Sequence, residues 1–325
     1  MSVTVFYAAL LAFFIALLVG PPLIEFLRRL KFGQSIRQDG PKTHLRKAGI
    51  PTMGGILIVA ATTVSTLVFT RGHVKVLYGL LAMLGFALIG LIDDFIIVVA
   101  KRSLGLRARY KLVGQIILGL AVSLYALSSP ELGSTILIPF TGKALGLSPW
   151  VFVVLATTTI VGTANAVNFT DGLDGLAAGT TAIAAVAYAL MAIGLNDWEL
   201  AAFAAAIAGA CLGFTWFNAH PAQVIMGDTG SLGLGAALGV LAILTRTELF
   251  LVIIGGVFVI ETLSIILQVS YFRLTGGRRI FRMAPLHHHF ELAGWPETKI
   301  VFRFWILAFV FAVLGLAGFP AVMGL

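Results

Sequence analysis

Long runs of apolar residues recur along the whole chain, and short polar segments separate them. There are ten runs, at roughly residues 4–27, 52–70, 75–98, 110–128, 149–167, 175–194, 199–217, 230–246, 248–272 and 302–323. Each is close to the ~20 residues that a helix needs to cross a bilayer core. The alternating pattern of strands is absent. The pattern predicts an all-α integral membrane protein with about ten transmembrane helices, in a single membrane domain over residues 1–325.

Composition agrees with a membrane protein. Of the 325 residues, 59% are hydrophobic and 11% are charged, and the mean hydropathy is +1.02, which excludes an ordinary soluble domain. No small-residue cleavage site closes the first apolar run, so we expect it to be retained as a span. Cys211 is the single cysteine and lies in the seventh run, so an intramolecular disulfide and a cysteine-based metal site are excluded.

The basic residues lie mainly in alternate loops, which predicts an orientation. Eighteen of the twenty-two Lys and Arg residues follow the first, third and ninth runs, and four lie in the opposite loops: Arg71, Lys75, Lys143 and Arg246. The positive-inside rule makes the richer side cytoplasmic. Ten spans then place both termini on the non-cytoplasmic side. The net charge is +8; basic residues beside a membrane are usually only topology signals, but they would also favour anionic membrane lipid and nucleotides. We expect no nucleic-acid partner.

The aspartates are distributed as unevenly as the basic residues. Six lie at cytoplasmic ends or loops, and only Asp197 lies on the other side: the six are Asp39, Asp93, Asp94, Asp171, Asp174 and Asp228. Aspartate is costly near hydrocarbon and has little influence on orientation. The pattern predicts one polar active-site cleft that opens at the cytoplasmic face.

Two adjacent aspartates, Asp93 and Asp94, stand at the end of the third run. Neighbouring carboxylates together attract a divalent cation. On a helix they point about 100° apart, so both need not bind the same ion. The alternative is a solvated helix end.

Asn165, Asn168, Asp171 and Asp174 recur at every third position. This spacing keeps side chains on one stripe of a helix, which could line a cleft. Amides and carboxylates together suit a base or a sugar, because they offer both donors and acceptors. Helix-capping turns are the alternative.

The segment from Phe217 to Ser231 separates the seventh and eighth runs and contains Gly227-Asp228-Thr229-Gly230. The glycines would allow consecutive backbone amides to face one point. Thr229 or Ser231 could cap the next helix, whose positive dipole end would face the site. Asp228 is the expected Mg²⁺ ligand, since Mg²⁺ prefers one or two carboxylates plus water and phosphate oxygens.

Three consecutive histidines, His287, His288 and His289, lie in the last cytoplasmic loop. Successive side chains diverge, so they do not form a zinc site together. We expect them to bind a diphosphate or orient a catalytic group, and a surface cluster without function is the alternative.

Two further features have two interpretations each. Glu261 lies inside the ninth run and could act in function or pair with a neighbouring helix. Gly54 and Gly55 could form a helix-packing face or a loop that approaches substrate.

In this order the segments resemble the bacterial phospho-N-acetylmuramoyl-pentapeptide transferases (translocase I) of the polyprenyl-phosphate N-acetylhexosamine-1-phosphate transferase superfamily. The similarity covers essentially the whole chain, and its motifs are Arg37-Gln38-Asp39-Gly40-Pro41, Lys47-Ala48-Gly49-Ile50-Pro51-Thr52-Met53-Gly54-Gly55, Asp93-Asp94, Asn168 to Gly175, Gly227 to Ser231 and Ala284-Pro285-Leu286-His287-His288-His289-Phe290-Glu291 with Gly294-Trp295. Relatives that use N-acetylglucosamine lack this form of the histidine segment, which makes it the most specific part.

The resemblance implies a reaction in a bacterial inner membrane. UDP-N-acetylmuramoyl-pentapeptide and undecaprenyl phosphate would give the first lipid-linked peptidoglycan precursor (lipid I) and UMP, with Mg²⁺ required and the enzyme a homodimer. Matched by motif, Asp228 is similar to the metal ligand, and Asp93 is similar to the residue that assists the lipid phosphate, with Asp94 in support. The remaining matches to residues that bind nucleotide, diphosphate or lipid phosphate are Lys47, Lys111, Asn168, Asp171, Asn218 and His287.

Three positions depart from the family pattern: Ile50, Ile97 and Ile225. Ile225 replaces an aromatic residue that stacks on uracil, a contact worth about 1 kcal/mol, so uracil affinity is in question. Asp39 and Asp174 have no assigned role. For the mechanism we favour direct attack by the lipid phosphate, with a covalent Asp93 intermediate as the alternative.

Two rival functions follow from the same features. A transferase that uses UDP-N-acetylglucosamine is the first, and the histidine segment argues against it. The second is a transporter, whose polar residues would lie at the bilayer midplane, whereas most acidic residues here lie at one face.

Overall fold

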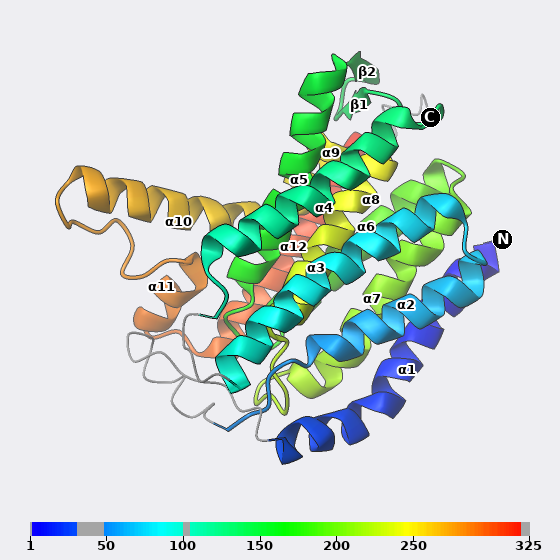
Figure 1. Cartoon of the computed structure of the whole chain (residues 1–325). Coiled ribbons are helices and arrows are strands. Elements are labelled where there is room, and N and C mark those ends of the chain that lie inside the picture. Colours follow the sequence, from blue (N-terminus) through cyan, green and yellow to red (C-terminus); the bar gives the residue numbers. More distant parts are fainter. Residues whose placement is uncertain (1, 31–48, 100–104, 320–325) are drawn as a thin grey trace.

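The computed structural model of the chain describes residues 2–30, 49–99 and 105–319. Asp39 and Lys47 lie outside the described residues. The elements in chain order are α1 (Ser2–Arg29), α2 (Gly55–Thr70), α3 (Val74–Val99), α4 (Ala108–Ser128), β1 (Thr135–Ile138), β2 (Lys143–Gly146), α5 (Pro149–Thr170), α6 (Leu176–Gly194), α7 (Trp198–Asn218), α8 (Gly227–Leu244), α9 (Glu248–Ile254), α10 (Gly256–Leu274), α11 (Leu286–Leu292) and α12 (Glu297–Gly318). They form one helical bundle with a small hairpin at one end (Figure 1).

The helical membrane fold is confirmed. Among the described residues, nine helices are long and apolar enough to cross a membrane, and α2 is a shorter apolar helix of 16 residues. These ten helices match the ten predicted runs in order, with one change. The ninth run, residues 248–272, is not one helix, because the chain breaks at Gly255 between α9 and α10.

The expectation that the chain contains no strands is wrong in one place. β1 and β2 form an antiparallel pair, with Thr135 opposite Gly146 and Ile138 opposite Lys143. The hairpin is attached to two helical segments far along the chain. The Leu137 backbone N–H donates to the Arg246 carbonyl at 2.9 Å, and the Phe140 N–H donates to the Gly318 carbonyl at 3.3 Å.

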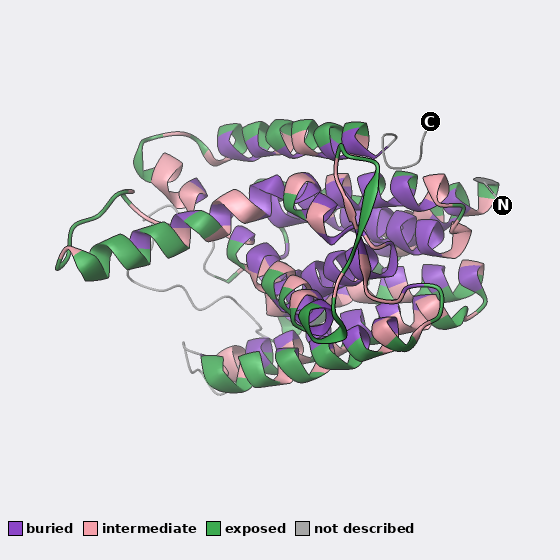
Figure 2. Ribbon diagram, turned by 90° about the horizontal axis from the view of Figure 1, so that it is seen from above, coloured by how far each residue is buried: buried purple, intermediate pink, exposed green. Residues whose placement is uncertain are grey.

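Helix α8 forms the centre of the bundle. Every residue from Thr229 to Leu244 is buried, and α2, α3 and α5 pack around it. Gly55 at the start of α2 contacts Gly230 so closely that a Cβ on Gly55 would lie 2.1 Å from the Gly230 nitrogen. Such close backbone approach is how small residues fasten membrane helices together. Figure 2 shows the resulting pattern of a buried interior with exposed faces on the outer helices.

The two ends of the bundle differ in chemistry. At the hairpin end, the Lys75 ammonium lies 2.9 Å from the Asp197 carboxylate and 3.2 Å from that of Glu131. Asp93 lies on the same helix as Lys75 but 18 residues further along, which is about 27 Å of helix, and Asp94 follows it. Helix α10 projects sideways from the bundle (Figure 1), with apolar side chains such as Leu267 and Phe272 about half exposed.

Candidate active site

The site is built around the first turn of α8, which Asp94 caps from a different helix. Its carboxylate accepts hydrogen bonds from the backbone N–H of Asp228 at 3.1 Å, the N–H of Thr229 at 3.0 Å and the Thr229 hydroxyl at 2.7 Å. A carboxylate at a helix N-terminus also interacts favourably with the helix dipole. Neither Thr229 nor Ser231 caps the helix as predicted, because α8 begins earlier, at Gly227.

Gly227 is required where it stands. Its φ is +73°, and a Cβ there would lie 2.7 Å from an Asp94 carboxylate oxygen. A residue with a side chain would be strained in this conformation and would push Asp94 away. The sequence Gly227-Asp228-Thr229 therefore lets one acid from α3 bind the backbone that presents Asp228.

Asp228 lies among a cation, an amide and a second acid. Its Oδ2 forms an ion pair with the Lys111 ammonium of α4, and its Oδ1 accepts a 2.8 Å hydrogen bond from the Asn168 side-chain amide of α5. The same amide nitrogen donates to the Ser231 hydroxyl at 2.9 Å. Three predicted site residues far apart in sequence, Lys111, Asn168 and Asp228, are thus brought together.

Asp93 faces the same cluster but is held differently from its neighbour. The Leu106 backbone N–H donates to its Oδ1 at 2.9 Å, and Asp228 and Lys111 are its charged neighbours. Gly105, with a φ of +56°, leaves room for this carboxylate, because a Cβ would lie 2.7 Å from Asp93 Oδ2. The two adjacent aspartates therefore have different hydrogen-bond partners, as expected for neighbouring side chains that point in different directions from a helix.

The donor set fits a hard divalent cation. Asp93 and Asp228 are neighbouring carboxylates, and carboxylate oxygens are the protein ligands that Mg²⁺ prefers. The ammonium of Lys111 already pairs with Asp228, so this part of the structure attracts positive charge. Asp228, with Asp93 beside it, is one place where the described residues could hold a divalent metal ion.

The prediction that Asn165, Asn168, Asp171 and Asp174 form one helical stripe is wrong. Helix α5 ends at Thr170, and Asp171 is its C-terminal cap, so only the two asparagines share a helix face. The Asn165 amide donates to Gln115 Oε1 at 2.7 Å and lies in a helix contact. Asp171 and Asp174 belong to the turn of residues 171–175 that follows α5.

That turn is fastened by Asn218, which was predicted to bind substrate. The Gly175 backbone N–H donates to Asn218 Oδ1 at 2.9 Å, and Asn218 Nδ2 donates to the Val224 carbonyl at 2.8 Å. Asn218 is buried, and both ends of its amide bind backbone. Its observed contacts hold the turn against the segment before α8.

The three histidines diverge only in part, because the rings of His287 and His288 lie side by side with centroids 4.1 Å apart. His287 is fully buried, with its Nδ1 3.2 Å from Glu261 Oε2 and its backbone N–H donating to Glu261 Oε1 at 3.2 Å. Its Nε2 lies against Gly172, where a Cβ would be 2.2 Å away. Glu261 therefore pairs with the short helix α11, and because its partner is a predicted site residue, both interpretations of Glu261 stay open. Of the two interpretations of Gly54 and Gly55, the structure favours helix packing, since both contact the segment at the start of α8.

The other two histidines have different polar contacts from His287. His288 Nδ1 lies 2.7 Å from Glu291 Oε2 on its own short helix, α11. His289 Nδ1 accepts the Arg282 backbone N–H at 3.1 Å. The prediction that they bind substrate stays a prediction.

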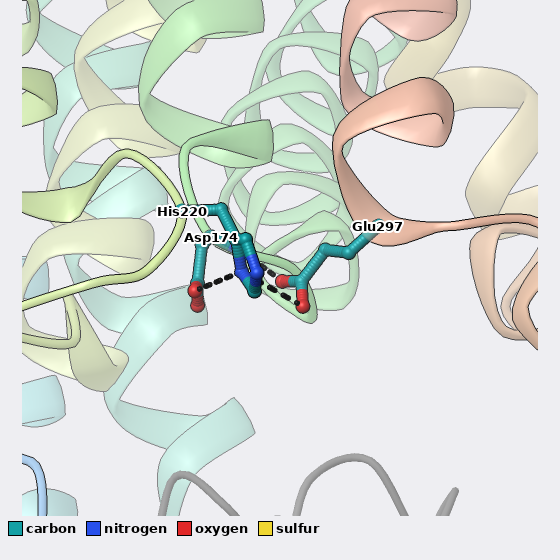
Figure 3. A group of neighbouring side chains, drawn as sticks. All are labelled: Asp174, His220 and Glu297. Carbon is teal, nitrogen blue, oxygen red and sulfur yellow. Dashed lines mark hydrogen bonds and ion pairs between the residues drawn. The ribbon is translucent and has the colours of Figure 1, made fainter.

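Two residues that sequence reasoning missed lie beside the 171–175 turn. His220 Nδ1 is 3.0 Å from Asp174 Oδ2 and 3.4 Å from Glu297 Oε2, so the three side chains meet at one point (Figure 3). His220 belongs to a segment that the sequence singled out. Glu297 gives no signal of its own, because its partner Asp174 is 123 residues away.

Two family models match parts of the chain. The family model for glycosyl transferase family 4 matches residues 76–246, which is more than half of the chain. A second model, phospho-N-acetylmuramoyl-pentapeptide-transferase signature 1, matches residues 47–59. The first match spans α3 to α8 and contains Asp93, Lys111 and Asp228.

Full-length relatives agree with these matches. A phospho-N-acetylmuramoyl-pentapeptide-transferase of Moorella thermoacetica is 56% identical over 94% of this chain and 96% of its own. Proteins of that name from Desulforudis audaxviator and Bacillus subtilis are each 50% identical, over 97% and 96% of this chain and 98% and 97% of theirs. With matches of this extent, the chain belongs to the phospho-N-acetylmuramoyl-pentapeptide-transferase family.

Proposed function

We propose that this protein transfers phospho-N-acetylmuramoyl-pentapeptide from UDP to undecaprenyl phosphate, forming lipid I and UMP. The observation that carries the proposal is the identity of 50% or more with transferases of this name over nearly the whole chain. The cluster of Asp93, Asp228, Lys111 and Asn168 supplies acid, cation and amide groups suited to a diphosphate substrate.

We propose an inner-membrane location with this cluster at the cytoplasmic face. The charge asymmetry of the loops supports that orientation, since most Lys and Arg residues follow the first, third and ninth apolar runs. Asp93 and Lys75 stand near opposite ends of α3. The hairpin end would then face the outside, together with the two chain termini.

In the proposed reaction, an oxygen of the lipid phosphate attacks the β-phosphorus of the nucleotide, and UMP leaves. Such a transfer depends on alignment and on stabilisation of the charge that builds up on the leaving oxygen. Lys111 supplies positive charge, and Asn168 holds Asp228 in place. Mg²⁺, held by Asp228 with Asp93 beside it, would add charge neutralisation when bound. Asp93 assists the attacking phosphate, and the phosphate is already mostly ionised near neutral pH.

An apolar groove beside the site is the position that we propose for the polyprenyl chain of the acceptor. A cavity of about 240 Å³ lies between α5 and the α9–α10 break, and is lined by Leu251, Val259 and Leu263 among others. Its α5 wall continues to Ala166, half a turn before Asn168. We propose that the acceptor enters here. The homodimer stays a prediction from family resemblance.

The nucleotide choice is tested by offering both candidate donors to the purified protein. We expect Mg²⁺-dependent UMP release from UDP-N-acetylmuramoyl-pentapeptide with undecaprenyl phosphate, and release at least a hundredfold slower from UDP-N-acetylglucosamine. Faster release from UDP-N-acetylglucosamine would favour the rival transferase. Transport of a solute into vesicles without UMP release would favour a transporter.

A further inference from the structure

Three ionisable side chains from three separate elements meet at the edge of the site. Asp174 comes from the 171–175 turn, His220 from the segment between α7 and α8, and Glu297 from the first turn of α12. Figure 3 shows the His220 ring between the two carboxylates. None of the three has a role in the reaction proposed above.

Backbone hydrogen bonds bind the same three elements together. The Asp174 N–H donates to Glu297 Oε1 at 2.7 Å, and the Ala222 N–H donates to Asp174 Oδ2 at 3.1 Å. One residue further along, the Trp305 indole N–H of α12 donates to the Gly175 carbonyl at 3.2 Å. Hydrogen bonds therefore hold the 171–175 turn to α12 and to the segment between α7 and α8. His220 contacts Asp174 of the turn and Glu297 of α12.

The side chains around His220 indicate which ring nitrogen carries a hydrogen. Nδ1 lies 3.0 Å from one carboxylate oxygen and 3.4 Å from another, and both oxygens can only accept when ionised. A hydrogen on Nδ1 is the tautomer that gives an ionised carboxylate a donor here. This donor links the carboxylate of Asp174 in the turn to that of Glu297 in α12.

The turn carries residues that matter for the proposed reaction. Asp171, the expected nucleotide-binding residue, begins it, and Gly172 covers the buried ring of His287. Asn168, whose amide holds Asp228, lies three residues earlier at the end of α5. A shift of the turn would therefore displace the nucleotide side of the site before it displaced the groove proposed for the lipid.

We propose that His220 is a positioning residue, which fixes the 171–175 turn by bridging Asp174 and Glu297 and so sets the affinity for the uridine nucleotide. The inference rests on the proposed function. A divalent cation between the same side chains is the competing explanation, because their ligand atoms lie within 4.8 Å of one another. Each carboxylate already accepts a backbone N–H, so the network is held together without an ion.

The test compares three variants of the full-length protein in detergent or nanodiscs. His220→Ala removes the donor. His220→Asn keeps a side-chain N–H near the position of Nδ1. His73→Ala is the matched control, since His73 is an exposed histidine between α2 and α3, near the Lys75 end of the bundle.

We expect His220→Ala to raise KM for the nucleotide about tenfold, the size of a lost hydrogen bond to a charged group. Its kcat should change less than threefold, and KM for undecaprenyl phosphate should not change. His220→Asn should recover most of the nucleotide affinity, and His73→Ala should equal the wild type. A thermal unfolding curve for each variant shows whether the change in nucleotide KM has this specific cause or comes from a general loss of folded protein.

Three results would overturn the proposal. They are an unchanged nucleotide KM in His220→Ala, an equal rise in both KM values, and stoichiometric bound metal in the wild type that His220→Ala loses.

If the wild type releases no UMP, the proposed function fails. Calorimetric binding of UMP to the wild type and the variants then decides the role of His220, with the same tenfold loss expected.

Discussion

At the scale of single residues, Asp93 and Asp94 show how adjacent acids acquire different tasks. Asp94 is buried and gives its carboxylate to three donors at the start of α8. Asp93 accepts one backbone N–H and faces Asp228 and Lys111. Asp94 therefore holds the backbone of Asp228 in place, whereas Asp93, also buried, is the acid that we propose assists the substrate.

Amide substitutions separate these two tasks. Asp94→Asn turns one acceptor into a donor that faces backbone N–H groups, which should destabilise the protein by about 2 kcal/mol. We expect a lower Tm together with lost activity. Asp93→Asn should keep the Tm within about a degree and lower kcat. Unfolding curves and UMP release measure both, and an unchanged Tm in Asp94→Asn would contradict the capping role.

Single residues also mark how far the sequence could predict the site. The uneven distribution of the aspartates correctly predicts that Asp93, Asp94 and Asp228 form one cluster. Their positions at the ends of apolar runs place them at the same end of the helical bundle. The prediction that Asp171 and Asp174 continue a helical stripe is wrong, because the three-residue spacing does not show that α5 ends at Thr170. His220 and Glu297 were missed, since their contact depends on how α12 packs beside the turn.

At the scale of elements, α8 connects the site to the bundle. Its first turn presents Asp228, and its backbone is approached closely by α2, where Gly55 meets Gly230. The motif that contains Gly54 and Gly55 therefore acts through packing. A side chain at this contact would move the helix that carries Asp228.

Gly55→Ala tests this coupling. The added Cβ would lie 2.1 Å from the Gly230 nitrogen, and overpacking of this kind costs about 1–3 kcal/mol. We expect a lower Tm and a loss of activity of at least tenfold. Gly146→Ala in β2 is the control, because a Cβ there meets nothing within 4 Å. Wild-type activity and Tm in Gly55→Ala would show that the contact is not tight.

Elements also show where prediction from sequence stops. Hydropathy located all ten apolar runs, because the bilayer imposes their length and composition. It did not locate the break at Gly255, although the Gly255-Gly256 pair is a known helix-weakening signal. The hairpin strands have four residues each, and their contacts with Arg246 and Gly318 are invisible to local pattern.

At the scale of the whole molecule, the distribution of basic residues predicts which end of the bundle faces the cytoplasm. Lys143 lies on the exposed strand β2, and Arg278 is exposed beyond α10. The charge asymmetry predicts that Lys143 faces outward and Arg278 faces the cytoplasm. The single native cysteine, Cys211, is fully buried, so we expect no labelling of the unsubstituted protein by a thiol reagent.

Cysteine labelling measures this orientation. We expect a membrane-impermeant maleimide to label Lys143→Cys in intact cells, and to label Arg278→Cys only after the membrane is permeabilised. The unsubstituted protein should remain unlabelled in both conditions. The opposite pattern would place the Asp228 cluster outside the cytoplasm, where a cytoplasmic nucleotide could not reach it.

Mg²⁺-dependent UMP release tests the central claim most directly. Purified wild-type protein should release UMP from UDP-N-acetylmuramoyl-pentapeptide when undecaprenyl phosphate and Mg²⁺ are both present. Asp228→Asn should reduce the rate by at least a hundredfold, because it loses the charge that pairs with Lys111 and is proposed to hold Mg²⁺. UMP release by Asp228→Asn at the wild-type rate, or none by a folded wild type, would contradict the account.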